Sequence, residues 1–78
     1  MEETYQIEEM VQRYKIILFK EPNGEYTSNC KTFQSEKHLS DYINCELTNY
    51  GRKEVGIYSF YTWEELMEFR ILNRRMLN

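Results

Sequence analysis

The sequence predicts an α+β domain in which three strands and two helices follow one another in the order ββαβα. Three observations point to this fold: one segment alternates apolar side chains on both faces of a strand, a Pro-Asn-Gly turn follows it, and two segments with helical spacing begin at capping residues. The most apolar strand should lie centrally. We therefore expect a three-stranded antiparallel sheet in the order 2-1-3, with the two main helices on one face.

The first strand covers residues 14–21, YKIILFKE. Ile16 and Leu18 share one face of this strand, because side chains alternate along an extended chain. Ile17 and Phe19 share the other face. A strand that is apolar on both faces is typical of the middle of a sheet.

A tight turn follows the first strand. Pro22 presets the first turn position, Asn23 suits the second, and Gly24 can adopt a positive φ. These residues predict a hairpin into a second strand at residues 25–34. Its sequence, EYTSNCKTFQ, is polar and suits the edge of a sheet.

Both main helices carry start signals. Ser35 is a good N-cap, and Gly51 is suited to end the first helix. The apolar positions between them have helical spacing: Leu39, Tyr42, Ile43, Leu47 and Tyr50. Residues 54–61, EVGIYSFY, are typical of a third strand. Thr62 and Glu65 then match the capping box that opens the last helix.

The N-terminal segment, residues 1–13, is less regular than the rest. Apolar residues at positions 7, 10, 11 and 14 have helical spacing, which predicts a short helix near residues 4–12. The alternative is an extended or frayed tail. With 78 residues in all, we expect one domain that spans residues 1–78.

Composition limits the classes of function. The net charge of −3 is mild and argues against a general nucleic-acid binder, which usually has a basic surplus. Residues 1–13 hold four glutamates and no apolar run, so we expect a cytoplasmic protein with no membrane segment. Alanine is absent, while residues with AT-rich codons are common. The small size and this composition suggest a phage or mobile-element origin.

No complete catalytic or metal site is visible in the sequence. His38 is the only histidine, and Cys30 and Cys45 are the only cysteines. Cys45 follows His38 by nearly two helical turns, which is too far for a direct hydrogen bond. The three residues offer only three zinc ligands without a close Cys pair. We expect reduced thiols, no cofactor and no enzymatic activity.

The last helix has more apolar residues than one sheet can cover. A helical wheel puts one group toward the sheet: Leu66, Phe69, Met76 and Leu77. Trp63, Met67 and Ile71 form a second stripe at i, i+4 and i+8. Three arginines border this stripe, Arg70 and Arg74 on one side and Arg75 on the other.

Two interpretations of the second stripe remain open. In the first, the N-terminal segment covers it through Tyr5, Ile7, Met10 and Val11. In the second, the stripe and its arginines bind another protein or a second copy, since Trp, Met and Arg are enriched at interfaces. The two combine if the segment is a removable cover. The sequence thus predicts a small protein-binding module, a regulator or inhibitor that occupies a partner's surface.

The alternative function is binding of RNA or DNA through aromatic residues of the sheet. Gly56, Ile57, Tyr58 and Phe60 loosely resemble the aromatic strand of RNA-recognition domains, where rings stack on bases. In those domains a helix follows the first strand, whereas the turn at Pro22 predicts a hairpin here. Such domains also have a basic residue directly before the glycine, where this chain has a valine.

Overall fold

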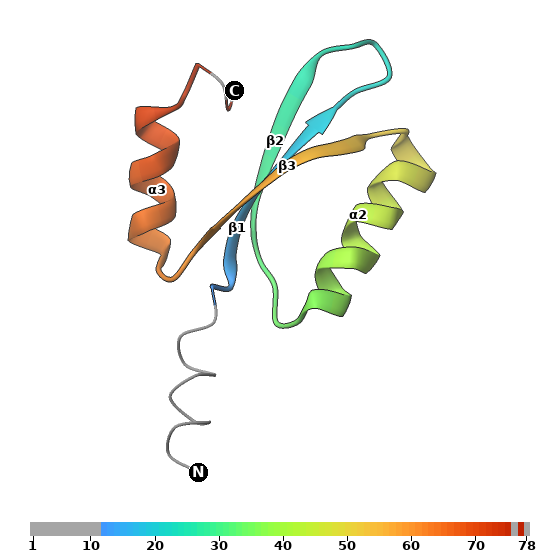
Figure 1. The fold of residues 1–78 in the computed structure, drawn as a ribbon. Helices are drawn as coiled ribbons and strands as arrows, with labels where there is room; N and C mark the ends of the chain where they lie inside the picture. The colour runs from blue at the N-terminus through green and yellow to red at the C-terminus, as the bar shows by residue number, and fades with distance from the viewer. Residues whose placement is uncertain (1–11, 76, 78) are drawn as a thin grey trace.

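The computed structural model describes residues 12–75 and 77 and has the predicted order of elements (Figure 1). The strands are β1 (Tyr14–Lys20), β2 (Tyr26–Thr32) and β3 (Lys53–Phe60), and the helices are α2 (Glu36–Tyr50) and α3 (Trp63–Leu72). The short helix expected near residues 4–12, and the cover through Tyr5, Ile7, Met10 and Val11, involve residues outside the described part of the chain.

The three strands form an antiparallel sheet in the order β2-β1-β3, as predicted. On β1, Ile16 pairs with Cys30 on one side and with Tyr58 on the other. Both neighbours run antiparallel to β1, so β2 and β3 are parallel to each other and α2 is the crossover between them. Between Leu18 and Phe19 the pairing with β3 shifts and leaves Val55 as the extra residue of a bulge.

The hairpin between β1 and β2 turns where the sequence predicts. The amide of Gly24 donates to the carbonyl of Glu21 at 2.9 Å, and Gly24 has a φ of 92°. A positive φ is accessible to glycine at no steric cost, so this position fixes the turn. At the start of α2, the Ser35 hydroxyl accepts from the amide of His38, and at its end Gly51 adopts the left-handed conformation.

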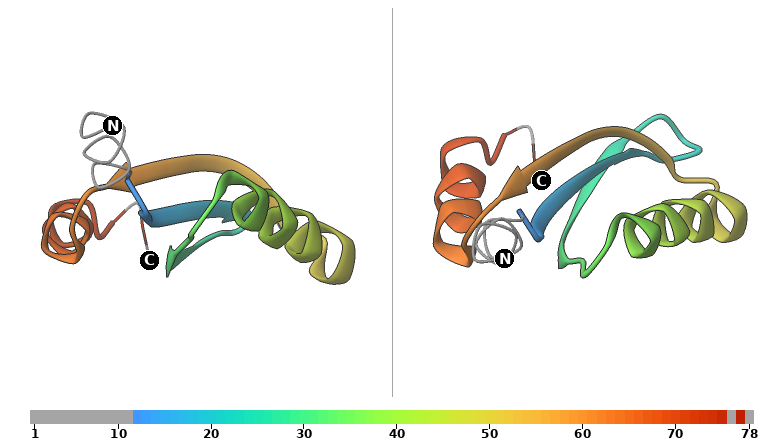
Figure 2. Two further views of the ribbon diagram at one scale, coloured as in Figure 1. Left: turned by 90° about the horizontal axis from the view of Figure 1, so that it is seen from below. Right: turned by 60° about the horizontal axis from the view of Figure 1, so that its bottom comes forward.

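The expectation that both helices share one face is wrong. α2 packs on the side of β1 that carries Ile17 and Phe19, whereas α3 packs on the side that carries Ile16. Figures 1 and 2 show the sheet passing between the two helices, and α2 and α3 make no contact with each other. The physical reason lies in β1 itself. Ile16 and Ile17 are both fully buried, so each face of the central strand needs its own helix.

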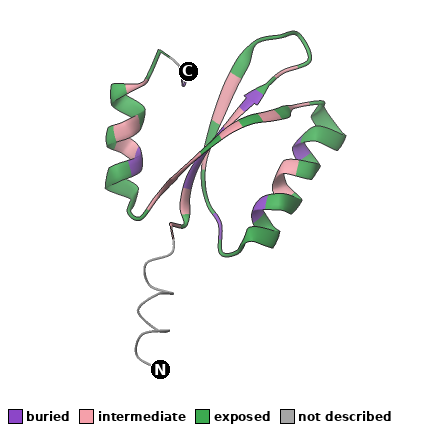
Figure 3. Ribbon diagram, viewed as in Figure 1, coloured by how far each residue is buried: buried purple, intermediate pink, exposed green. Residues whose placement is uncertain are grey.

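The domain therefore has two small cores instead of one. Under α2, Ile17 and Phe19 pack against Phe33 and Leu39. Under α3, the buried residues are Ile16, Leu66 and Leu77. Figure 3 shows buried positions on β1 and on the inner sides of the helices, with the outer side of α3 exposed. A helix that touches only one face of a sheet leaves the rest of its circumference open to solvent.

Candidate protein-binding surface on α3

Helix α3 begins at the capping box that the sequence predicts. The Thr62 hydroxyl accepts from the amide of Glu65 at 3.1 Å, and the Glu65 carboxylate accepts from the amides of Thr62 at 3.3 Å and Tyr61 at 2.9 Å. These bonds satisfy amides that the first helical turn leaves without partners. The direction in which α3 leaves the sheet is thus set by its first residues.

The inner side of α3 is anchored by two residues. Leu66 is fully buried in the core beside Ile16. The ring of Phe69 packs against Tyr58 with centroids 5.0 Å apart and against Phe60 at 5.2 Å. These contacts confirm that Leu66 and Phe69 belong to the sheet side. The helix ends at Leu72, so Leu77 reaches the same core after a turn and not as part of the helix.

The second stripe of the predicted helix does not behave as one surface. The Trp63 ring meets Tyr14 edge-on, with centroids 6.0 Å apart, and remains 43% exposed. Met67 is half-buried and packs against the core under α3. Ile71 is 62% exposed. The stripe is therefore open mainly at its C-terminal end, because its first two residues lie partly against the sheet.

Leu72 is the exposed residue that the sequence analysis does not assign. It is 78% exposed, the largest value among the exposed large apolar residues that the structure describes. Its position could be found on a helical wheel, since it lies about 120° away from Leu66. Leu72 and Ile71 are adjacent on the last turn, and together they place two aliphatic side chains in solvent.

Three arginines flank this pair along the chain, one directly before it and two shortly after it. Arg70, Arg74 and Arg75 are all exposed, and none has an ion pair within residues 12–75 and 77. An open hollow of about 450 Å³ lies between Ile71, Leu72, Asn73, Arg74 and Arg75. We call the group that consists of Arg70, Ile71, Leu72, Arg74 and Arg75 the terminal surface of α3. It combines exposed aliphatic groups with guanidinium groups that have no charge partner among the described residues.

The aromatic residues of the nucleic-acid alternative lie elsewhere. Tyr58 and Phe60 are half-buried on the sheet face that α3 covers, and both rings pack against Phe69. Base stacking needs an open ring face. The placement of these two rings therefore favours a role in the core under α3.

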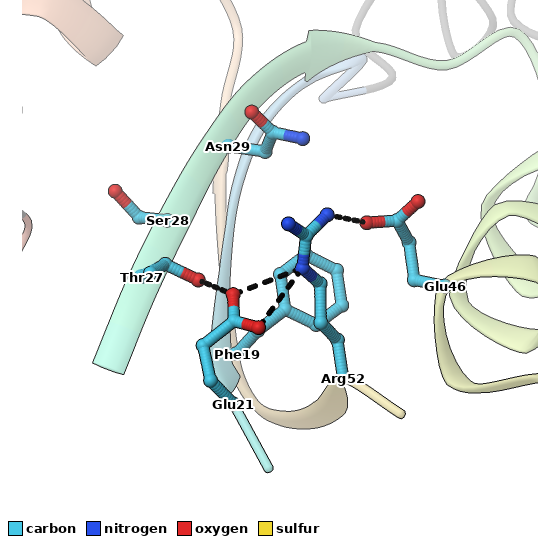
Figure 4. Close-up of a pocket in the computed structure, with 7 residues that line it drawn as sticks. All are labelled: Phe19, Glu21, Thr27, Ser28, Asn29, Glu46 and Arg52. Carbon is cyan, nitrogen blue, oxygen red and sulfur yellow. Dashed lines mark hydrogen bonds and ion pairs between the residues drawn. The ribbon is translucent and has the colours of Figure 1, made fainter. Parts of the chain in front are cut away.

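A polar cluster holds α2 against the hairpin (Figure 4). Arg52 donates from Nε to both oxygens of Glu21, at 2.9 and 3.1 Å, and from Nη1 to Glu46 at 2.9 Å. The Thr27 hydroxyl, which donates to Glu21 at 2.7 Å, and Arg52 hold the pKa of that carboxyl below its ordinary value, against the opposing effect of burial. Both carboxylates pair with the same guanidinium group, so the cluster acts as a structural clamp.

The residues tested for catalysis do not converge. Cys30 packs in the core under α3, while His38 and Cys45 are exposed on α2, on the opposite face of the sheet. The Cys45 sulfur accepts a hydrogen bond from Asn49 at 3.0 Å. Within the described residues, no group of three His, Cys, Asp or Glu side chains could hold a metal ion.

The same part of the chain contains no helix that is long and apolar enough to cross a membrane. No protein-family model, curated protein or solved structure matches the chain, so the interpretation of the terminal surface rests on its own geometry.

Proposed function

We propose that this chain is a small non-enzymatic protein-binding module that acts by occupying a partner's surface with the terminal surface of α3. The observation that carries the proposal is the exposure of two adjacent aliphatic residues, Ile71 at 62% and Leu72 at 78%. Burying such side chains against a partner is favourable by roughly 25 cal/mol per Å² of apolar surface. The neighbouring arginines support the same interpretation, since arginine is enriched at interfaces.

A binding role of this kind suits a regulator or inhibitor. The domain holds its shape with two small cores and a polar clamp, and its outer helix is free to meet another molecule. A cytoplasmic location and a phage or mobile-element origin are parts of the same proposal, and they rest on composition.

Site-specific photo-crosslinking tests the proposal. A photoreactive amino acid is placed at position 72 in one variant and at position 47 in another. Leu47 is a matched control, because it is 50% exposed and lies on α2, away from the terminal surface. We expect a discrete crosslinked protein from position 72 and none from position 47. Equal crosslinking from both positions, or none from position 72, would remove the proposal.

A further inference from the structure

The charges on the terminal surface restrict what can cover it. Arg74 and Arg75 line the same hollow as Ile71 and Leu72, and Arg70 directly precedes the pair, so a partner that buries the aliphatic pair also removes water from neighbouring guanidinium groups. Removing water from an unpaired charge is costly unless an opposite charge replaces the water. The occupant must therefore bring carboxylates to the places where these arginines lie.

A second copy of the chain meets this requirement only in part. In a two-fold interface centred on the terminal surface, the same patch of both chains is buried, and its residues meet different residues of the other copy. Antiparallel pairing of α3 would offer the three arginines of one chain only Glu64 and Glu68 of the other, so fewer carboxylates than guanidinium groups enter the interface. A simple polyanion also fits poorly, because it leaves Ile71 and Leu72 uncovered.

We propose that the terminal surface of α3 receives an acidic, apolar peptide segment of a different protein. Aliphatic or aromatic side chains of the segment cover Ile71 and Leu72, and its carboxylates pair with the arginines. The inference rests on the proposed function and names the chemistry of the partner. Arginine suits this task because its planar guanidinium donates two parallel hydrogen bonds to one carboxylate.

The acidic residues of α3 determine where along the helix the acidic part of the segment can lie. Glu64 and Glu68 are exposed on the earlier turns of the helix, whereas the arginines lie at its end. A strongly acidic stretch along the whole helix would meet these two carboxylates. The acidic part of the segment therefore lies at the C-terminal end of α3, and residues beyond it are neutral or basic.

Selection from a random dodecapeptide library displayed on phage tests this proposal with the full chain as bait. We expect enriched peptides that combine Asp or Glu with large apolar residues. The double variant Arg74→Glu/Arg75→Glu should bind them about tenfold more weakly or worse, and Leu72→Asp should weaken binding about fivefold or more.

The matched control is Lys20→Glu/Lys53→Glu. These lysines are exposed and directly opposite each other on β1 and β3. Reversing both changes the net charge by the same amount as the arginine double variant does. It also replaces one pair of like charges by another, so the local repulsion between the two positions is kept. We expect less than about a twofold loss of peptide affinity in this control. An equal loss in both double variants would mean that net charge alone governs binding, which overturns the proposal.

Other outcomes also decide the matter. No enrichment, or enrichment of neutral or basic peptides, overturns the acidic chemistry. Binding that depends on the arginines but not on Leu72 identifies a general anion patch and overturns the proposal as well. A mass that doubles with concentration in light scattering, and returns to that of a monomer in Leu72→Asp, identifies a second copy as the occupant. If no acidic peptides are enriched, a crosslink at position 72 still supports the proposed function. If that crosslink is also absent, both the proposed function and this inference are overturned.

Discussion

Two leucines on α3 should differ sharply in what their truncation costs. Leu66 is fully buried, and a Leu→Ala change at such a site lowers the free energy of unfolding by about 3 kcal/mol through lost burial and the cavity left behind. Leu72 is 78% exposed, so about a fifth of its side chain is buried. Since full burial of a leucine contributes about 2 kcal/mol, Leu72→Ala should cost about 0.4 kcal/mol.

Thermal unfolding followed by circular dichroism measures this difference. In a domain of this size, 1 kcal/mol shifts Tm by about 4–8 °C, which predicts a fall of about 12–24 °C for Leu66→Ala and about 2–3 °C for Leu72→Ala. If Leu66→Ala leaves too little folded protein, the milder Leu66→Val still ranks the two sites. Similar losses at both positions would refute the reasoning, because they would mean that Leu72 is covered within the folded chain.

Three further predictions concern the clamp, the core under α2 and the residues tested for catalysis. The pKa of Glu21 is lowered from 4.5, so its stabilising contribution is complete above about pH 4.5 and is lost as pH falls through the folded-state pKa. Urea unfolding measured from about pH 6 to about pH 3 should show this loss of stability in wild type and not in Glu21→Gln. Burial raises the pKa of Tyr42 above 10.0, so stability should fall as pH rises above about 10, and Tyr42→Phe should flatten that part of the profile. His38→Ala and Cys45→Ser change exposed residues and should alter the free energy of unfolding by less than about 0.5 kcal/mol, with the crosslink at position 72 retained; its loss from a folded variant would contradict this account.

Local chemistry explains why the elements could be predicted from the sequence. The hairpin depends on Gly24, and the starts of the two helices depend on hydrogen bonds that nearby amides donate to the hydroxyl oxygens of Ser35 and Thr62. Each signal acts within four residues of chain, so no knowledge of packing is needed. Strand order followed from the apolar character of β1, which is a property of one segment.

The distribution of the helices over the two faces depended on information that is not local. The alternation of β1 shows that both faces need a cover, but it does not say which helix lies on which face. The crossover from β2 to β3 takes α2 to one face, and the short turn after Phe60 takes α3 to the other. A wheel drawn for α3 without knowledge of the sheet placed Met67 too far outside, because the sheet and Tyr14 cover more of the first turns than of the last.

The candidate surface was predicted in part for the same reason. Ile71 and the arginines were identified from helical spacing and charge, and the structure leaves all of them exposed. Leu72 was missed because the wheel was divided into a sheet side and one stripe, and Leu72 belongs to neither. The end of the helix at Leu72 has only a weak signal in the sequence, since Asn73 follows it where glycine is the more usual residue.

The most direct test compares the affinities of two aspartate variants for the protein that crosslinks at position 72. Leu72→Asp and Leu47→Asp place the same charge on exposed leucines of α3 and α2, and both should melt close to wild type. The account predicts that Leu72→Asp loses affinity about tenfold or more, while Leu47→Asp binds as wild type does. Full affinity in Leu72→Asp, or an equal loss in both variants, would contradict the claim that α3 carries the interface.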